Sequence, residues 1–450
     1  MEMRRARWGF PRWTLVLTVA AVLLIEALHQ LAYHRSTLDP VLDWVYRSAM
    51  ADSWRPMFKA YAAVHAPHSE PLYQVLFFQG QVKFQYPLTS LLPLQFADLL
   101  GIEPHRRWLN RVGFVCVLLQ VLAVAQITYL AFRPRLSATL GRPALAGVWA
   151  AAALMALCFY PMLSAYRLGQ VQTWINAWFS LACLAWMYGR PGWAGALIGL
   201  ACLFKPQLAL FLPWALLRRQ WHFVAGWGAV ALSGAALSIG FFGWRDNLDY
   251  FPVLSFMSRY GEAFYANQSV NGLLHRLLGN GNTLTWDEHV FPPYNAVVHV
   301  ATLLSSALLI GAALLYRWRE REASVVDLMI AGLSFTMASP IAWEHHYGVM
   351  AAAFPLLAAL ILEHGQAALR QRLLLLLVLS FLLCSLMWPS VRDLAFTWAS
   401  FGQSQLLFGA LIALGLLYRE RDRAVRRLFV GKAVQRALGS EGAARPGSFA

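Results

Sequence analysis

The chain has 450 residues, of which 59% are hydrophobic and 13% are charged. A soluble protein of this size needs far more surface charge, and many apolar runs are long enough to cross about 30 Å of hydrocarbon, so we predict an all-α polytopic membrane protein. The net charge of +15 comes mostly from basic residues in short loops and at the termini. That distribution follows the positive-inside rule and argues against binding to nucleic acid.

Twelve apolar segments are predicted as transmembrane helices. They are 13–33, 109–131, 144–160, 170–188, 191–204, 207–217, 221–243, 296–316, 326–339, 346–362, 371–388 and 401–418. The first follows four arginines and precedes no small-residue cleavage site, so we expect an uncleaved span that leaves the amino end in the cytoplasm. Lys205-Pro206 separates the fifth and sixth segments, which are either two broken helices or one kinked helix.

The polar stretches gather on one side of the membrane in the predicted topology. The segment 86–101 contains proline, glutamine and aspartate, and we expect it to lie on the membrane surface or to dip into it. The long loops 34–108 and 244–295 then face outward, while the loops on the other side are short and basic. We expect one domain over 1–418 and a basic cytoplasmic tail over 419–450.

The first outer loop carries acids beside aromatic residues. Asp39 precedes Pro40 and suits a helix N-cap, because aspartate caps well and proline fits the first helical turn. Asp43 is therefore the candidate for chemistry, since a carboxylate at the lipid interface can take a proton from a hydroxyl group. The choice between Asp43 and Asp39 stays open.

Two polar positions interrupt the apolar segments in the middle of the chain. Gly169-Gln170 opens a span, where glycine permits close backbone approach and glutamine offers a hydroxylated ligand both a donor and an acceptor. Helix packing with a polar cap is the alternative there. Lys205 stands in apolar surroundings, where a cation needs an anion such as phosphate unless its side chain snorkels to the interface.

The second outer loop concentrates hydrogen-bonding and aromatic side chains. Asn267, Gln268 and Arg276 fall within ten residues and suit a sugar or a phosphate. The many aromatic residues of this loop either stack on sugars or lie among lipid headgroups.

A turn over 339–347 places a histidine pair beside the hydrocarbon edge. A Ser-Pro pair ends one apolar segment, and Trp343, His345 and His346 come before the next. Ionisable groups at this depth are expensive and indicate a functional site, although an ordinary loop with aromatic interfacial anchors is the alternative. Adjacent histidines leave a helix about 100° apart, and all five cysteines lie in apolar segments, so no metal site and no disulfide framework is expected.

Taken in order, these stretches resemble glycosyltransferase family 87, whose members are GT-C-type integral membrane enzymes that use polyprenyl-phosphate-linked mannose. The matching motifs are Asp43 with Val45 and Tyr46; Tyr86-Pro87; Gly169-Gln170; Lys205-Pro206; Asn267-Gln268-Ser269 with Gly272 and Arg276; and Ser339-Pro340 with Trp343, His345 and His346. They are spread over most of the chain. One departure is Glu344, which stands where the resemblance leads us to expect aspartate.

The resemblance implies a GT-C-type fold with its active site on the outer face. It also implies an inverting transfer from a β-linked polyprenyl phosphate donor to an α-linked product, with Asp43 as the general base. His345 or His346 would lie by the sugar or the phosphate, and Lys205 and Arg276 would compensate the phosphate charge. The further candidates for substrate binding are Tyr86, Gln170, Asn267, Gln268 and Trp343.

We therefore expect a hexosyltransferase of a bacterial inner membrane, with its site on the periplasmic or outer face. It would move a hexose, expected to be mannose, from a polyprenyl phosphate carrier to a lipid or glycan acceptor, without a cofactor. The sequence contains no glycine-rich nucleotide loop, which fits a lipid-linked donor. The alternatives are a non-catalytic transporter or flippase of lipid-linked saccharides, whose polar path must reach both faces, and a structural subunit of an envelope complex.

Overall fold

The computed structural model describes residues 49–66, 70–139, 141–320, 322–386 and 388–443, with scattered positions between 20 and 36. At 135–139, 141, 142, 389 and 426–443 it describes the backbone alone. Most of the predicted span 13–33 lies outside the described residues, and so do Asp39 and Asp43.

The described chain is all-helical, which confirms the predicted fold class. Up to residue 242 the elements are α3 (Trp54–His65), η1 (Gln74–Gln79), η2 (Leu88–Leu91), α4 (Leu92–Leu99), α5 (Arg106–Thr139), α6 (Gly141–Leu157), α7 (Tyr160–Arg167), α8 (Gln172–Met187), α9 (Pro191–Cys202), η3 (Pro206–Leu210), α10 (Phe211–Leu217) and α11 (Trp221–Phe242). After it they are α12 (Trp244–Leu248), α13 (Tyr250–Tyr260), α14 (Val270–Leu277), α15 (Ala296–Leu315), α16 (Val325–Met337), η4 (Glu344–Ala352), α17 (Ala353–Ile361), α18 (Ala367–Ser385), η5 (Pro389–Arg392), η6 (Ser400–Ser404) and α19 (Gln405–Ala443).

Fewer of these helices have the length of a membrane span than the sequence suggested. Five of the described helices are long and apolar enough to cross, and the bent pair α6 and α7 makes a sixth if the two are taken together. Prolines and 3₁₀ turns divide other predicted spans into shorter pieces. Lys205 is extended and Pro206 begins η3, so Lys205-Pro206 separates two helices rather than kinking one. The count of twelve spans is not confirmed.

The segment 86–101 forms the two short helices η2 and α4. Their twelve residues measure about 20 Å at most, which is too short to cross a bilayer. Phe96 and Leu99 of α4 and the following Leu100 are exposed. Both features agree with the expected surface helix.

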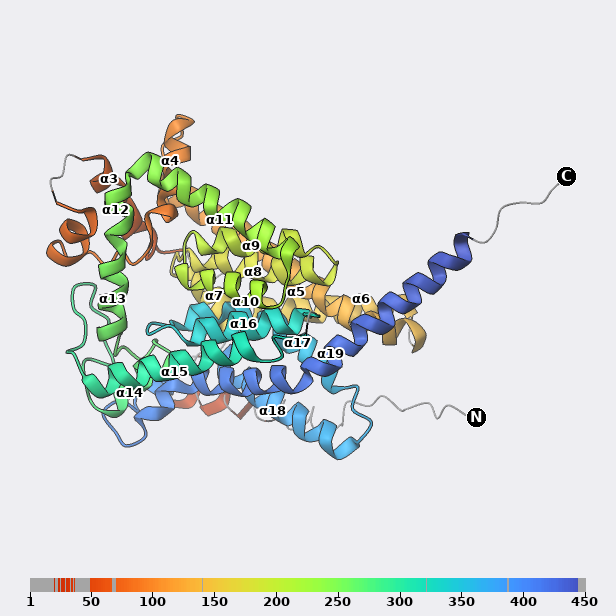
Figure 1. Ribbon diagram of the computed structural model, residues 1–450. Coiled ribbons are helices and arrows are strands. Elements are labelled where there is room, and N and C mark those ends of the chain that lie inside the picture. Colours follow the sequence, from red (N-terminus) through yellow and green to blue (C-terminus); the bar gives the residue numbers. More distant parts are fainter. Residues whose placement is uncertain are drawn as a thin grey trace.

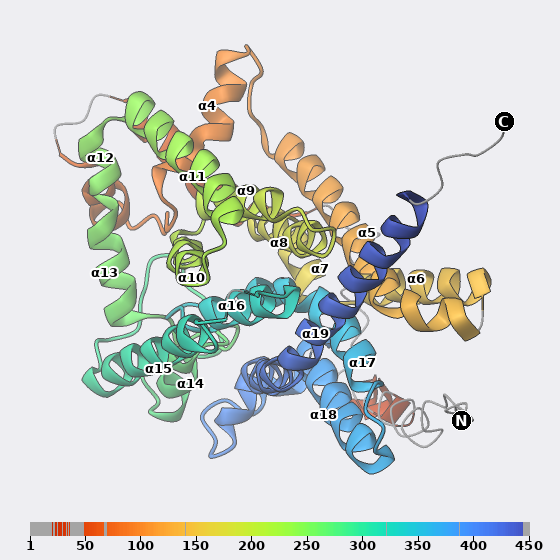
Figure 2. The ribbon, with the colours of Figure 1, turned by 45° about the vertical axis from the view of Figure 1, so that its right-hand side comes forward.

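The helices form two groups, α5 to α11 and α15 to α19 (Figures 1 and 2). Between them runs η4, which packs against α7 and α8 on one side and against α16 and α17 on the other. A Cβ at Gly348 in η4 would lie 2.1 Å from Asn176 Nδ2 on α8, so only glycine permits this close approach. The histidine pair at the start of η4 is thereby placed between the two groups.

The two long loops pack on each other at one end of the molecule, which we call the loop end and which carries α3, α12 and α13 in Figure 1. Asp249 Oδ2 accepts hydrogen bonds from two consecutive backbone N–H groups of the first loop at 2.7 and 3.1 Å. Lys83 Nζ lies 3.1 Å from Glu262 Oε2 and donates to two carbonyls of the second loop at 2.8 Å. Both charged side chains are only 8% exposed, so this contact is an internal one.

At the opposite end, which we call the tail end, α19 projects beyond the other helices (Figure 1). The Arg421 side chain of α19 is 2% exposed, and its Nε donates to Asp327 Oδ1 of α16 at 2.9 Å. Asp327 also accepts the backbone N–H of Ser324 at 2.7 Å, which caps α16. The predicted tail continues α19 as a helix to Ala443.

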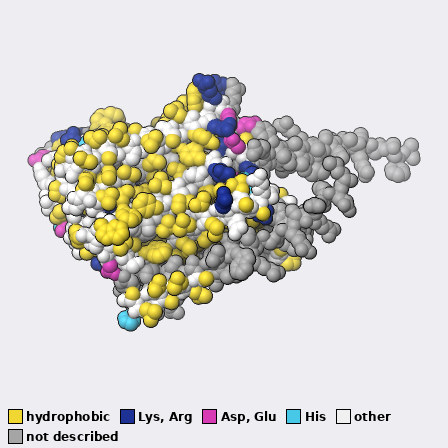
Figure 3. Space-filling model, turned by 90° about the horizontal axis from the view of Figure 1, so that it is seen from below, with side chains coloured by type: hydrophobic (Ala, Val, Ile, Leu, Met, Phe, Trp, Pro, Cys, Tyr) yellow, Lys and Arg dark blue, Asp and Glu magenta, His cyan; other side chains and the backbone are white. Residues whose placement is uncertain are grey.

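Hydrophobic side chains cover much of the surface around the helices. Figure 3 shows them over most of one face, with charged side chains gathered toward its margins. On α15 the exposed side chains include Val297, Leu304 and Leu308. A surface of this composition is stable against hydrocarbon and not against water.

Candidate active site

The end of the first loop is attached to the turn between α7 and α8. The backbone N–H groups of Met50, Asp52 and Ser53 donate to three consecutive carbonyls of residues 167–169, at 2.8, 2.9 and 3.2 Å. Gly169 has φ +67°, and a Cβ there would lie 2.1 Å from the Met50 carbonyl oxygen. The predicted Gly169-Gln170 motif thus provides a docking point for the first loop.

Gln170 links Ser53 and Tyr86 of the first loop to the carboxylate of Asp52. Ser53 Oγ donates to Gln170 Oε1 at 2.6 Å, and Tyr86 Oη lies 2.8 Å from Ser53 Oγ and 3.3 Å from the same oxygen of Gln170. With its oxygen engaged by two hydroxyls, Gln170 directs its amide N–H to the Asp52 carboxylate. Burial raises the pKa of the Asp52 carboxyl, and the Gln170 hydrogen bond opposes that shift. Two predicted site residues, Tyr86 and Gln170, therefore meet at Asp52.

Replacing Gly169 by Ala is expected to reduce activity far more than stability. The left-handed backbone costs about 1–2 kcal/mol with a side chain present, and the Cβ also pushes the Met50–Ser53 segment off the turn. Gly189→Ala is the matched control, because Gly189 has φ +70° with nothing within 4 Å of its Cβ position. We expect both variants to lose melting temperature, Gly169→Ala the more because of the clash, and only Gly169→Ala to lose activity; equal activity in the two would contradict a docking role.

Lys205 and the histidine pair lie in a buried cluster in which several polar side-chain atoms have no hydrogen-bond partner in the described part of the chain. Among the described residues, no partner is within reach of Lys205 Nζ, His345 Nε2, His346 Nδ1 or Gln172 Oε1. Lys205, His346 and Gln172 line one small cavity of about 10 Å³, and the two imidazole rings are 4.8 Å apart. That space holds about one water molecule, so a larger anion must approach Lys205 from the cavity rim. Buried polar groups without partners call for a ligand or an ion.

Asn267 and Gln268 are occupied by backbone groups. Asn267 accepts from the Ala342 N–H at 2.9 Å and donates to the carbonyls of Glu262 and Pro340 at 2.8 and 3.1 Å. Gln268 donates to the Gln403 carbonyl at 2.7 Å and accepts from the first backbone N–H groups of α19. Both side chains are fully buried. The Asn267 side chain holds the 339–344 turn in place, and Gln268 holds it through its backbone N–H, which donates to the Ala342 carbonyl at 2.8 Å. Their direct contact with substrate stays a prediction.

Arg276 and Trp343 lie beside this turn. The Arg276 guanidinium donates to the carbonyls of Asn267 and Phe264 at 3.0 and 3.2 Å and to Ser404 Oγ at 2.6 Å, while its Nε has no partner among the described residues. Trp343 pairs with Asn267 in an isolated antiparallel bridge, and its ring is half-buried. Two of these three hydrogen bonds therefore hold the second loop, and the predicted role of Arg276 toward phosphate stays untested.

A second buried carboxylate, Glu344, opens η4. Tyr160 Oη donates to Glu344 Oε2 at 2.8 Å. Burial raises the pKa of the Glu344 carboxyl to about 7, against the lowering effects of the Tyr160 hydrogen bond and the Arg276 charge. The residue that departed from the expected motif is thus a group that titrates near neutral pH.

Glu344→Gln is expected to remove a pH dependence of stability. The folded state holds the Glu344 proton more tightly than the unfolded state, so wild type loses stability as the pH rises from about 5 to about 8, by roughly 3 kcal/mol for a shift of this size. Apparent melting temperatures across this range measure the effect. The exposed Glu103→Gln serves as the control, and a parallel decline in Glu344→Gln and wild type would contradict the raised pKa.

Three residues of the site were not predicted from the sequence: Asp52, Ser53 and Gln172. Asp52 and Ser53 precede a helix, so in sequence they resemble ordinary capping residues. Gln172 stands two residues after Gln170, and this Gln-x-Gln spacing was the only signal for it. In the folded protein all three lie at the start of α8: Gln172 begins that helix, and tertiary contacts bring Asp52 and Ser53 to it.

The fold and the site define a polytopic helical membrane protein with a buried polar site at its loop end. The sequence model of glycosyltransferase family 87 matches residues 84–340, more than half of the chain. The protein belongs to glycosyltransferase family 87, as the resemblance of its motifs predicted.

Similar curated proteins carry related names. The chain is 28% identical over 279 residues to the polyprenol-phosphate-mannose-dependent alpha-(1-2)-phosphatidylinositol mannoside mannosyltransferase of Mycolicibacterium smegmatis, covering 60% of each chain. It is 27% identical over 290 residues to the protein of that name from Mycobacterium tuberculosis, covering 60% of this chain and 62% of that one. The chain thus spans about three fifths of the length of these relatives.

A solved structure, ArnT from Cupriavidus metallidurans bound to undecaprenyl phosphate, aligns with 92% of this chain and 78% of that one. The identity is 16% and the TM-score is 0.31, a likeness too weak to define the fold.

Proposed function

We propose that the protein transfers a hexose, mannose in the first instance, from a polyprenyl phosphate carrier to a lipid or glycan acceptor. The family and the names of the similar proteins support this donor class. The observation that carries the proposal is the Lys205 ammonium group, which is 8% exposed and has no hydrogen-bond partner in the described part of the chain. A phosphate group at the cavity rim would give this cation the anion that it lacks.

The proposed reaction inverts the anomeric carbon. A carboxylate takes the proton from the acceptor hydroxyl, the hydroxyl oxygen forms the new bond at the anomeric carbon, and the bond to the phosphate oxygen breaks with its electrons going to the carrier phosphate. Lys205 compensates the charge that develops on this phosphate, with His345 and His346 beside it. A β-linked donor then gives an α-linked product.

Asp43 is the proposed base. Ala49, six residues later, lies directly before the segment that docks at Gly169, and six residues span about 20 Å at most. This limit is compatible with the proposed role of Asp43 near the α8 start. Asp52 is the second candidate, because Gln170 already holds its carboxylate there.

We place the protein in a bacterial inner membrane with the loop end on the periplasmic or outer face. Long polar loops at one end and basic residues near the other support this orientation.

The test is transfer of radiolabelled mannose from polyprenyl-phosphate-mannose to membrane lipids by the full chain in vesicles. We expect a mannosylated product whose new linkage is α by NMR. If the protein bound the donor but transferred no sugar, the proposed transferase activity would be contradicted. Movement of intact lipid-linked saccharide across the vesicle membrane would instead establish a flippase.

A further inference from the structure

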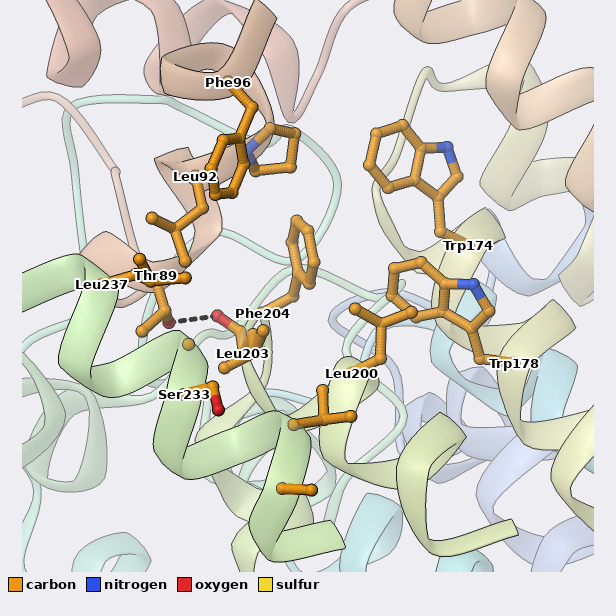
Figure 4. A pocket seen from close by; sticks show the side chains of 14 residues that line it. Thr89, Leu92, Phe96, Trp174, Trp178, Leu200, Leu203, Phe204, Ser233 and Leu237 are labelled. Carbon is orange, nitrogen blue, oxygen red and sulfur yellow. Dashed lines mark hydrogen bonds between the residues drawn. The ribbon is translucent and has the colours of Figure 1, made fainter. Parts of the chain in front are cut away.

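An apolar cavity of about 420 Å³ lies among η2, α4, α8, α9 and α11 (Figure 4). Its walls include Leu92 and Phe96 from one side and Trp174, Trp178 and Phe204 from the other. Ser233 of α11 lines it as well. The lining is almost entirely hydrocarbon and aromatic, so a ligand that fills it is apolar.

One side of this cavity opens on the lipid-facing surface. Phe96 and Leu237 line it and are also 42% and 41% exposed, on α4 and on the span α11. A hydrocarbon chain in the bilayer can therefore enter between these helices without passing through water.

The other side adjoins the unpaired cation. Trp174 and Phe204 are buried with their ring centroids 5.8 Å apart. Phe204 lines the apolar cavity, and the next residue, Lys205, lines the small polar one. On α8, Trp174 lines the first cavity and Gln172 the second. An amphiphile with its hydrocarbon chain in the apolar cavity and its anionic head at the rim of the polar one fits this arrangement.

We propose that this cavity holds the isoprene units of the donor next to the phosphate, and only those; the inference rests on the proposed function. A cavity of about 150 Å³ binds benzene, which allows roughly 25 Å³ for each carbon. The cavity of about 420 Å³ then takes roughly 17 carbons, or about three isoprene units. The rest of the carrier stays in the bilayer, so the protein distinguishes donors by the first three units and is indifferent to the length beyond them.

The experiment compares mannosyl phosphates carrying one, two, three, four and eleven isoprene units, at equal mole fractions in detergent micelles with the full chain. We expect kcat/KM to rise with each unit up to about three, because each added unit gains packing contacts with the cavity wall and helps to position the phosphate. From four to eleven units we expect a change of less than threefold. A continued rise to eleven units, or no dependence on length, would overturn the inference alone. Absence of transfer from every donor would overturn the proposed function and the inference with it.

Ser233→Phe fills the cavity from α11 and should remove this selectivity. The ratio of kcat/KM between the four-unit and one-unit donors is expected to fall at least tenfold. Ala236→Phe adds the same ring at an exposed position of α11 outside the lining and should keep the ratio within twofold of wild type. If Ser233→Phe does not fold, Ala229→Phe fills the same wall. A wild-type ratio in the cavity-filling variant would place the donor chain elsewhere.

Discussion

Asp43→Asn is expected to reduce mannosyl transfer by roughly 10²- to 10⁴-fold, the usual contribution of a general base. The amide that replaces the carboxylate has the same shape and cannot take the acceptor proton. Donor binding should persist, because the proposed phosphate contacts come from Lys205 and the histidine pair. Turnover under saturating donor and the donor Kd, measured in the same preparation, check both parts.

Asp52→Asn is the matched comparison. Its new amide oxygen can still accept the Gln170 hydrogen bond, and no buried charge remains. We expect at least a tenth of wild-type turnover and an unchanged or higher melting temperature. The reverse pattern, with Asp43→Asn active and Asp52→Asn inactive, would transfer the role of base to Asp52.

Lys205→Met is expected to make the protein more stable and less active. A buried ammonium without partners destabilises the folded state, so its removal should add about 1–3 kcal/mol to the free energy of unfolding. Loss of the cation opposite the leaving phosphate should lower kcat/KM by about 100-fold or more. Melting temperature and kcat/KM, measured on the same variant, test whether stability rises while activity falls.

Lys83→Met provides the control. The Lys83 side chain is only 8% exposed, but its ammonium contacts Glu262 and two backbone carbonyls. Its removal leaves Glu262 without its cation, so we expect lower stability. If Lys205→Met also melted earlier than wild type, Lys205 would be a structural residue and not a substrate-binding one.

Hydropathy predicted most of the helices, because each apolar run from residue 109 onward is helical in the structure. It overestimated the number of full spans. The run 346–362 reads as one span, yet its first part belongs to the 3₁₀ segment η4, whose close packing on α8 depends on Gly348 and Asn176. The hydropathy of a segment cannot indicate a contact between two residues that are 172 positions apart in the chain.

The candidate site was predictable in part. Lys205 and the histidine pair were singled out separately, on the ground that charged groups in apolar surroundings are functional, and the structure brings them into one cluster. The opposite happened with Asn267 and Gln268, which look like ligand-binding amides in sequence and are saturated by the backbone in the fold. Amide side chains serve a ligand and a buried turn equally well, so only their surroundings distinguish the two uses.

The Arg421–Asp327 ion pair has a mechanical consequence. It fastens α19 to the first turn of α16 at the tail end. At the loop end α16 leads into the 339–344 turn, and the first N–H groups of α19 are bound by Gln268, which also supports that turn. The two helices thus run antiparallel and are held by contacts at both ends, and a shift of one helical turn along the axis, about 5.4 Å, would break both sets of contacts. The axial position of the histidine pair is therefore set partly by contacts at the tail end of the molecule.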